Sequence, residues 1–195
     1  MIAKRQMKEL KERIISDGKI INQDILKVDS FLNHQIDPIL TKHAALEIVD
    51  RFKDDKIDKI LTIESSGIAV SIMIGLELGV NIVFAKKNKP STMESNYTSR
   101  VKSFTKNTHH DVVVSSDYIK EGERVLIVDD FLAGGHAAQG MIEMLRQAKA
   151  KLVGVAIMIE KGFLEGGKEL RAQGIRLESL AIIDSLDNNK ISFRE

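Results

Sequence analysis

Short apolar runs alternate with segments of helical periodicity through the middle of the chain. Runs of valine and isoleucine between polar or glycine-containing segments are typical of buried strands, and apolar residues three or four apart are typical of helices. We expect helices at 2–16, 39–52, 68–78 and 136–148, the first ending near Gly18 and the second following Pro38. We expect strands at 59–63, 81–85, 112–114, 125–129 and 152–160.

Continuous apolar strands separated by helices indicate parallel strands that are covered on both faces. We therefore predict an α/β fold in which residues 41–160 form an open, doubly wound and mainly parallel twisted sheet flanked by helices. Residues 1–40 and 161–195 lie outside this alternation, and we expect them to form a small hood. A length of 195 residues is expected to make one domain.

The composition excludes several classes of function. Cysteine is absent, which rules out disulfides, thiolate nucleophiles and cysteine-based zinc sites. The 29 basic and 28 acidic residues leave a charge of +1, which argues against a nucleic-acid binder held by bulk charge. The longest apolar run has about eight residues, too few to span a membrane. The first fifteen residues lack the apolar core of a signal peptide, so a cytoplasmic protein is expected.

The strand at 125–129 ends in two adjacent carboxylates, Asp129 and Asp130. Buried like charges are unfavourable unless something satisfies them, and the vicinal diol of a ribose supplies two hydrogen-bond donors. Gly134 and Gly135 follow directly before a helix, where backbone amides and the helix dipole favour an anion. This unit therefore suits a ribose 5-phosphate, although spacing alone also allows acids that cap a loop or bind Mg²⁺. The two commonest nucleotide-binding patterns, Walker A and GxGxxG, are absent.

Residues 125–137, VLIVDDFLAGGHA, resemble the motif that binds phosphoribosyl pyrophosphate (PRPP) in type I phosphoribosyltransferases. The resemblance implies that the catalytic acids Asp129 and Asp130 contact the ribose hydroxyls. The sequence departs from the family at two positions, where glycine and threonine are frequent, and the missing threonine hydroxyl removes one phosphate contact. The resemblance implies that the 5-phosphate is bound by Ala133, Gly134, Gly135, His136 and Ala137, of which the last two are the departures.

The resemblance extends over most of the chain, through segments 25–38, 63–69, 81–87 and 159–163, and it points to the bacterial phosphoribosyltransferases that act on xanthine. It implies that Leu26 forms an apolar wall for the base, that Asn33 supplies an amide, and that Lys161 binds the base. A cationic donor distinguishes the 2-oxo group of xanthine from hypoxanthine and guanine. Lys161 paired with Glu160, and Asn33 as a turn residue, remain alternatives.

The segment ESSG at 64–67 ends the first core strand, and in the family this loop binds pyrophosphate with an unusual peptide geometry. A plain helix cap by one of its serines is a compatible reading. Three lysines follow the second strand, at 86, 87 and 89, and are either a solvated charge run or partly a pyrophosphate contact across a dimer interface. The pyrophosphate loop is thus expected to comprise Ser65, Ser66, Gly67 and Lys87.

The polar stretch at 89–106 is long enough to be a lid that closes over PRPP, with Tyr97 as one residue that lies over the phosphates. His109 and His110 look like a metal pair. Adjacent residues of a strand point to opposite faces, however, so no metal ligand is predicted there.

Taken together, the resemblance implies transfer of the phosphoribosyl group from PRPP to xanthine, with Mg²⁺ carried by PRPP, in a homodimer. A PRPP-sensing transcription regulator of the same fold is the alternative from another class. Its DNA-binding element would have to fit in the first 40 residues, which are too short and too balanced in charge for a winged helix. A hypoxanthine-guanine or adenine phosphoribosyltransferase is the nearer alternative, and an unrelated nucleotide-binding protein comes last.

Overall fold

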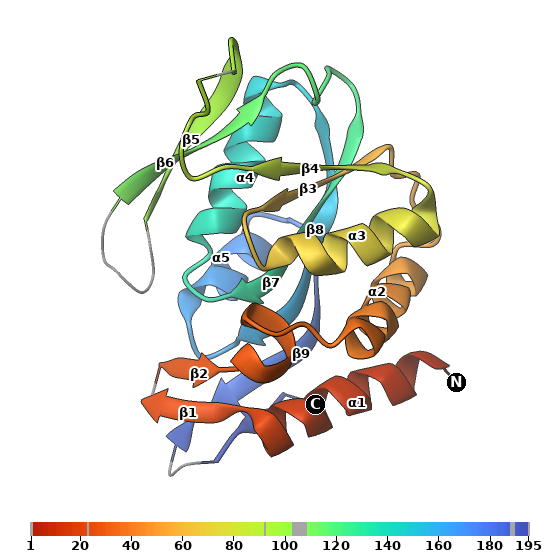
Figure 1. The fold of residues 1–195 in the computed structure, drawn as a ribbon, viewed down its shortest axis with the longest axis vertical. Coiled ribbons are helices and arrows are strands. Elements are labelled where there is room, and N and C mark those ends of the chain that lie inside the picture. Colours follow the sequence, from red (N-terminus) through yellow and green to blue (C-terminus); the bar gives the residue numbers. More distant parts are fainter. Residues whose placement is uncertain (1, 23, 92, 103–108, 188–189, 195) are drawn as a thin grey trace.

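The structure is a computed structural model that describes residues 1–195 except 1, 23, 92, 103–108, 188–189 and 195 (Figure 1). Its centre is a six-stranded sheet in the order β10-β9-β8-β7-β3-β4. All neighbouring strands are parallel except β10, which pairs antiparallel with β9. In chain order the strands are β3 (Lys59–Ile63), β4 (Asn81–Ala85), β7 (Arg124–Leu132), β8 (Lys151–Lys161), β9 (Leu177–Ser185) and β10 (Ser192–Phe193).

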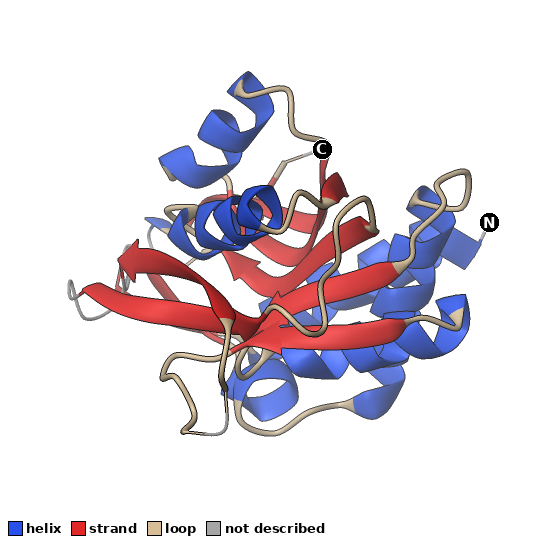
Figure 2. Cartoon of the chain, turned by 90° about the horizontal axis from the view of Figure 1, so that it is seen from above, coloured by secondary structure: helices blue, strands red, loops and turns tan. Residues whose placement is uncertain are grey.

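Helices cover both faces of this sheet, as the view from above shows (Figure 2). One buried cluster lies between the sheet and three helices, and a second lies between the opposite face and two others. Successive residues of β7 alternate between them, with Leu126 and Val128 in the first and Val125 and Ile127 in the second. The helices are α1 (Ile2–Asp17), α2 (Pro38–Arg51) and α3 (Gly67–Leu78) on the first face, and α4 (His136–Gln147) and α5 (Glu165–Ala172) on the second.

A small hood precedes the sheet in the chain. It consists of an antiparallel hairpin, β1 (Lys19–Asn22) and β2 (Ile25–Lys27), followed by a π-helical turn, η1 (Asp29–Asn33). Helix α2 then begins at Pro38, where the Asp37 carboxylate accepts hydrogen bonds from two backbone amides of the first turn. The predicted fold class, a mainly parallel twisted sheet with a hood, is confirmed, and the predicted helices all form within two residues of their expected bounds.

Two predictions about the middle of the chain were wrong. The strand predicted at 112–114 does not belong to the parallel sheet. It is part of β6 (His109–Ser115), which pairs antiparallel with β5 (Asn96–Lys102) in a separate two-stranded sheet. Part of the stretch predicted as a loop at 89–106 is therefore a strand, whose Val101 packs against Gly140 of α4. Residues 92 and 103–106 of the predicted lid lie outside the described residues.

The parallel sheet also continues beyond its predicted limit at residue 160. Strand β9 pairs in parallel with β8, so part of the segment 161–195, which was expected in the hood, forms a core strand of the sheet. The buried Leu180, Ala181 and Ile183 fix this strand in the sheet. Among the described residues, no helix combines the length and apolar character needed to cross a membrane.

Candidate active site

Asp129 and Asp130 lie in the last part of β7, and each is 6% exposed. The backbone N–H of Asp130 donates to Asp129 Oδ1 at 3.0 Å. Burial raises the pKa of Asp129 well above its ordinary value, the negative charge of Asp130 raises it further, and the positive charge of Lys87 opposes the shift. The two acids thus form the buried pair of like charges that the sequence predicts at this strand end.

Asn33, at the end of η1, connects the hood to this pair. Its Nδ2 donates to Asp130 Oδ2 at 2.7 Å and to Ser66 Oγ at 3.5 Å. The cap of α2 is Asp37, so Asn33 does not perform that local role. One amide therefore brings together the hood, the acid pair and the loop before α3.

The loop at 64–67 joins β3 to α3, and its Glu64–Ser65 peptide bond is cis. Ser66 occupies the N-cap of α3 without a side-chain capping bond, which disfavours the plain-cap interpretation for that residue. A Cβ atom added to Gly67 would lie 2.7 Å from Asp129 Oδ1, so only glycine allows the loop to approach the acid this closely. The backbone N–H of Lys87 donates to Glu64 Oε1 at 2.6 Å. The predicted pyrophosphate loop and Lys87 are therefore gathered beside Asp129.

The predicted phosphate loop lies between β7 and α4. Gly135 has a φ of 77° and stands at the N-cap of α4, where no side chain caps the helix. The first backbone N–H groups of a helix have no intrahelical acceptor, and the helix dipole favours an anion there. His136 is exposed at the first position of the helix, and Ala137 is half-buried behind it. The segment 133–137 thus opens the amide-lined end of α4, next to the acid pair.

Lys161 ends β8 and is 7% exposed. Its Nζ donates to the backbone oxygen of Asp24 at 2.5 Å and lies 5.8 Å from the centre of the Phe131 ring. Burial lowers the pKa of Lys161, and the charge of Asp24 opposes the shift. Leu26, two residues further along the hood, is buried. The hood and the end of β8 therefore meet at Lys161.

The alternative pairing of Lys161 with Glu160 is wrong. Consecutive strand residues point to opposite faces, and Glu160 instead accepts hydrogen bonds from Arg171 and Ser179. The pKa of Glu160 is lowered: burial alone would raise it, but the hydrogen bonds from these two residues outweigh that effect.

Sequence reasoning missed two features of the site. Gly166 of α5 lies directly against the backbone of the phosphate loop, and the sequence offers no signal for this contact beyond the small size of the residue. The hydroxyl of Thr62, on β3, is buried beside Gly67 and has no hydrogen-bond partner among the described residues. A threonine inside an apolar strand was the signal that could have pointed to it.

Other predicted features lie away from this centre. Tyr97 is on β5 and packs against the second buried cluster, which does not support a place over the phosphates. The side chains of His109 and His110 lie outside the described residues. Within the described part of the chain, no group of three or more histidine, aspartate or glutamate side chains is arranged to hold a metal ion.

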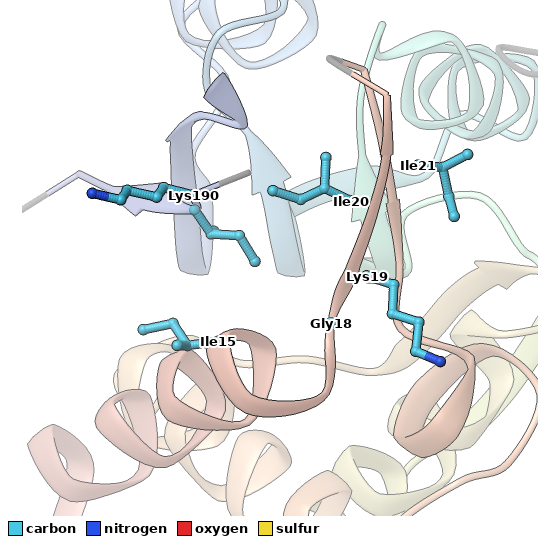
Figure 3. Close-up of a pocket in the computed structure, with 7 residues that line it drawn as sticks. Ile15, Gly18, Lys19, Ile20, Ile21 and Lys190 are labelled. Atoms are coloured by element: carbon cyan, nitrogen blue, oxygen red, sulfur yellow. The ribbon is translucent and has the colours of Figure 1, made fainter. Parts of the chain in front are cut away.

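A separate pocket of about 680 Å³ lies between the end of α1, strand β1 and residues 190–191 (Figure 3). Its walls include Ile15 and Ile20, while the amino groups of Lys19 and Lys190 point away from each other and out of the pocket. None of the predicted site residues lines it. It is therefore distinct from the candidate active site.

The parallel sheet, the acid pair at the end of β7 and the two glycine-containing loops define the class. Residues 27–180 match the family model described as "Phosphoribosyl transferase domain", and the chain belongs to this family. It is 53% identical over 188 residues to the xanthine phosphoribosyltransferase of Bacillus cereus (strain AH187), across 96% of this chain and 95% of that protein. The enzyme of the same name from Bacillus anthracis matches to the same extent.

Solved structures of adenine phosphoribosyltransferases share the fold. The enzyme from Rhodothermus marinus DSM 4252 has a TM-score of 0.74 at 23% identity, over 92% of this chain and 98% of that one. The enzyme from Saccharomyces cerevisiae, in a complex with adenine and an imino-altritol bisphosphate, has a TM-score of 0.74 at 23% identity over 91% and 99%. At this identity the likeness establishes the fold alone.

Proposed function

We propose that this chain transfers the 5-phosphoribosyl group of PRPP to xanthine, giving xanthosine 5′-monophosphate and pyrophosphate. The observation that carries the proposal is the meeting of the acid pair, the phosphate loop and the 64–67 loop at one end of the sheet. The relatives that are 53% identical over nearly the whole chain support xanthine as the acceptor.

PRPP has three recognisable parts, and each has a matching element. The 5-phosphate binds the backbone amides of 133–137, where the uncapped start of α4 favours an anion. The ribose hydroxyls donate to Asp129 and Asp130, which relieves the repulsion between two buried acids. The pyrophosphate binds the loop at 64–67 together with Lys87, which is near enough to Asp129 for its positive charge to lower the pKa of that acid. Asn33 holds the Asp130 carboxylate in place.

The reaction breaks the bond between the anomeric carbon and pyrophosphate, and the bonding electrons leave with pyrophosphate. Positive charge builds up on the anomeric carbon and the ring oxygen until a purine nitrogen forms the new bond and releases its proton. The chain contributes position and electrostatics: the loop amides and Lys87 stabilise the leaving group, and the acids hold the ribose in line.

Mg²⁺ accompanies PRPP in this proposal. Magnesium favours carboxylate, phosphate and water oxygens, and often binds through few protein ligands. The described residues offer the acid pair Asp129 and Asp130 at the site, and the phosphate oxygens of PRPP and water would supply the other ligands. When bound, it neutralises charge on the pyrophosphate.

The base is proposed to lie between the hood and the end of β8. Lys161 donates to the 2-oxo group, Asn33 supplies its amide, and Leu26 forms an apolar wall. The low exposure of Lys161 supports this role, because a desolvated cation interacts strongly with a carbonyl oxygen. Hypoxanthine offers no oxygen at that position and guanine offers an amine, so both are bound less well.

A cytoplasmic homodimer completes the proposal. Three exposed apolar side chains, Ile72 and Leu76 of α3 and Phe84 of the edge strand β4, support a second copy at this face. Leu76 is 74% exposed and Ile72, one helical turn away on the same face of α3, is 50% exposed, and adjoining exposed apolar side chains are typical of an interaction surface. Sedimentation should give twice the chain mass, and Leu76→Glu should give the chain mass; a monomeric parent protein would contradict the dimer.

The decisive assay offers xanthine, hypoxanthine, guanine and adenine separately with PRPP and Mg²⁺, and measures pyrophosphate release. We expect the highest kcat/KM with xanthine. A higher value for another base would contradict the acceptor. No turnover with any base, together with PRPP-dependent retardation of purine-gene DNA on a gel, would contradict the enzyme and favour a regulator.

A further inference from the structure

Helix α5 lies in backbone contact with the phosphate loop, although Gly166 follows Gly135 by 31 positions in the chain. A Cβ atom added to Gly166 would lie 2.3 Å from the backbone oxygen of Ala133 and 2.4 Å from the backbone nitrogen of Gly135. From the other side, a Cβ on Gly135 would lie 3.0 Å from the Cα of Gly166. No side chain fits between α5 and the phosphate loop, so the position of each backbone segment constrains the position of the other.

An ion pair between the buried Glu160 and the partly exposed Arg171 holds α5 in this place. Arg171 donates from Nη1 and Nη2 to the two carboxylate oxygens of Glu160 at 2.7 and 2.8 Å, and Ser179 Oγ donates to Oε2 at 2.5 Å. Glu160 is 1% exposed. A Cβ atom on Gly167 would clash with Glu160 Oε1, so the absence of a side chain at Gly167 allows α5 to pack directly against Glu160. Glu160 thus fastens α5 to β8 and β9.

We propose that Gly166 is a positioning residue for PRPP: its contact with Ala133 and Gly135 holds the phosphate loop in the conformation that binds the 5-phosphate. The Glu160–Arg171 pair acts through Gly166 by fixing α5. This inference rests on the proposed function, since it concerns the same phosphate site.

The physical reason lies in the flexibility of the loop itself. Gly135 allows the loop to adopt a φ of 77°, but the conformational freedom of the adjacent glycines Gly134 and Gly135 makes ordering the loop costly. Backbone amides bind an anion only when several N–H groups point at one position. A rigid neighbour that fits without a gap lowers the ordering cost before the ligand arrives. Displacement of such a loop by about 1 Å is enough to cost up to about 100-fold in turnover.

The test is Gly166→Ala, with Gly154→Ala as the matched control. Gly154 is also buried and tightly packed, because a Cβ there would lie 2.8 Å from Phe52 Cε1 and 3.0 Å from the backbone oxygen of Arg176. It stands near the start of β8, at the opposite end of the strand from Lys161. Both variants should lose stability, Gly166→Ala more because its Cβ meets backbone atoms, and only Gly166→Ala should affect the phosphate site.

Calorimetry measures the affinity for ribose 5-phosphate, and steady-state kinetics measures KM for each substrate. We expect Gly166→Ala to weaken ribose 5-phosphate binding and to raise KM for PRPP about 10- to 100-fold, with KM for xanthine nearly unchanged. Gly154→Ala should leave both values as in the parent protein. Equal binding by Gly166→Ala and the parent protein would overturn the inference, as would an equal loss in the two variants.

A second pair of variants keeps the test decisive if Gly166→Ala does not fold. Arg171→Met removes the donors to Glu160, and Arg171→Lys retains one. We expect a raised KM for PRPP in the first and partial recovery in the second; a KM for PRPP unchanged in Arg171→Met would overturn the inference. Failure of the parent protein itself to bind ribose 5-phosphate or to turn over PRPP would instead refute the proposed function, so the two failures are distinguishable.

Discussion

The neighbouring strands β7 and β8 each carry two consecutive charged residues near the carboxyl end, and the acids of the two strands lie in opposite environments. Glu160 of β8 is buried and receives hydrogen bonds from Arg171 and Ser179, which lower its pKa. Asp129 of β7 is also buried and accepts a hydrogen bond from the backbone of Asp130; burial and the negative charge of Asp130 raise its pKa. Glu160 therefore has a cationic partner, Arg171, within the protein.

The difference indicates which buried charges belong to the fold and which to a ligand. An acid whose charge is satisfied by an arginine contributes to packing, and removal of the partner is costly. An acid held next to another acid, with a raised pKa, opposes folding at neutral pH and is typical of a functional site. In this chain Asp129 is an acid of the second kind, and it lies between the loops at 133–137 and 64–67.

The largest expected effect concerns the β7 pair. Asp130→Asn should lower kcat/KM for PRPP by about 100-fold or more, the usual scale for one preorganised polar contact in a reaction centre. Circular dichroism should show an unaltered fold. The comparison of the strands would fail if steady-state kinetics gave the turnover of the parent protein.

The ion pair between Glu160 of β8 and Arg171 of α5 should affect stability more than turnover. We expect Glu160→Gln to lower the free energy of unfolding by about 2–3 kcal/mol, less than for a fully buried pair because Arg171 is partly exposed. Asp129→Asn should raise the free energy of unfolding at neutral pH, because it removes an acid whose charged form is disfavoured by burial and by the charge of Asp130. Urea denaturation at pH 7 measures both; changes of the same sign would contradict this distinction.

Lys161, which follows Glu160 at the end of β8, should affect the choice of base. We expect Lys161→Ala to reduce the preference for xanthine over hypoxanthine about 10- to 100-fold, the worth of one hydrogen bond to a charged group. Lys168→Ala is a suitable control, because Lys168 is an exposed lysine paired with Glu165 on α5. A ratio of the two kcat/KM values that does not change in Lys161→Ala would remove its proposed role.

The smallest effect is on the pH dependence of stability. The lowered pKa of Glu160 means that its contribution is complete above its ordinary value of 4.5 and is lost as pH falls through the lowered value. The raised pKa of Asp129 has the opposite sign: stability is lost as pH rises from its ordinary value of 3.8 to the raised one. Thermal melts from pH 3 to 8 should therefore show a flatter acid limb in Glu160→Gln and less loss towards neutral pH in Asp129→Asn. Curves parallel to that of the parent protein in both would contradict these assignments.

Sequence reasoning located the strands that carry the site because they are buried on both faces. The run at 125–129 is apolar at every position before the acids, which leaves little ambiguity. The β5–β6 ribbon was missed because residues 96–102 are mostly polar and read as a loop. Strand β9 was missed because Ser179 and Asp184 interrupt its apolar pattern.

The site itself was predictable in its components and not in its contacts. The acids and the glycines lie in one short motif at 129–135, the serine loop forms another at 64–67, and resemblance to a family assigned them roles. The bond from Asn33 to Asp130 and the contact of Gly166 with the phosphate loop join residues that are far apart in the chain. Such contacts depend on how the hood and α5 pack, which no local pattern records.

Titration of PRPP with Mg²⁺ into the parent protein, the double variant Asp129→Asn/Asp130→Asn and Glu160→Gln separates the role of the β7 acids in binding from that of Glu160. Calorimetry at a temperature where all three are folded isolates binding from stability. We expect the parent protein and Glu160→Gln to bind PRPP, the latter more weakly because its phosphate loop is less well held, and the double variant to show no measurable binding. Undiminished binding by the double variant would contradict the claim that the acids at the end of β7 are held for the ribose.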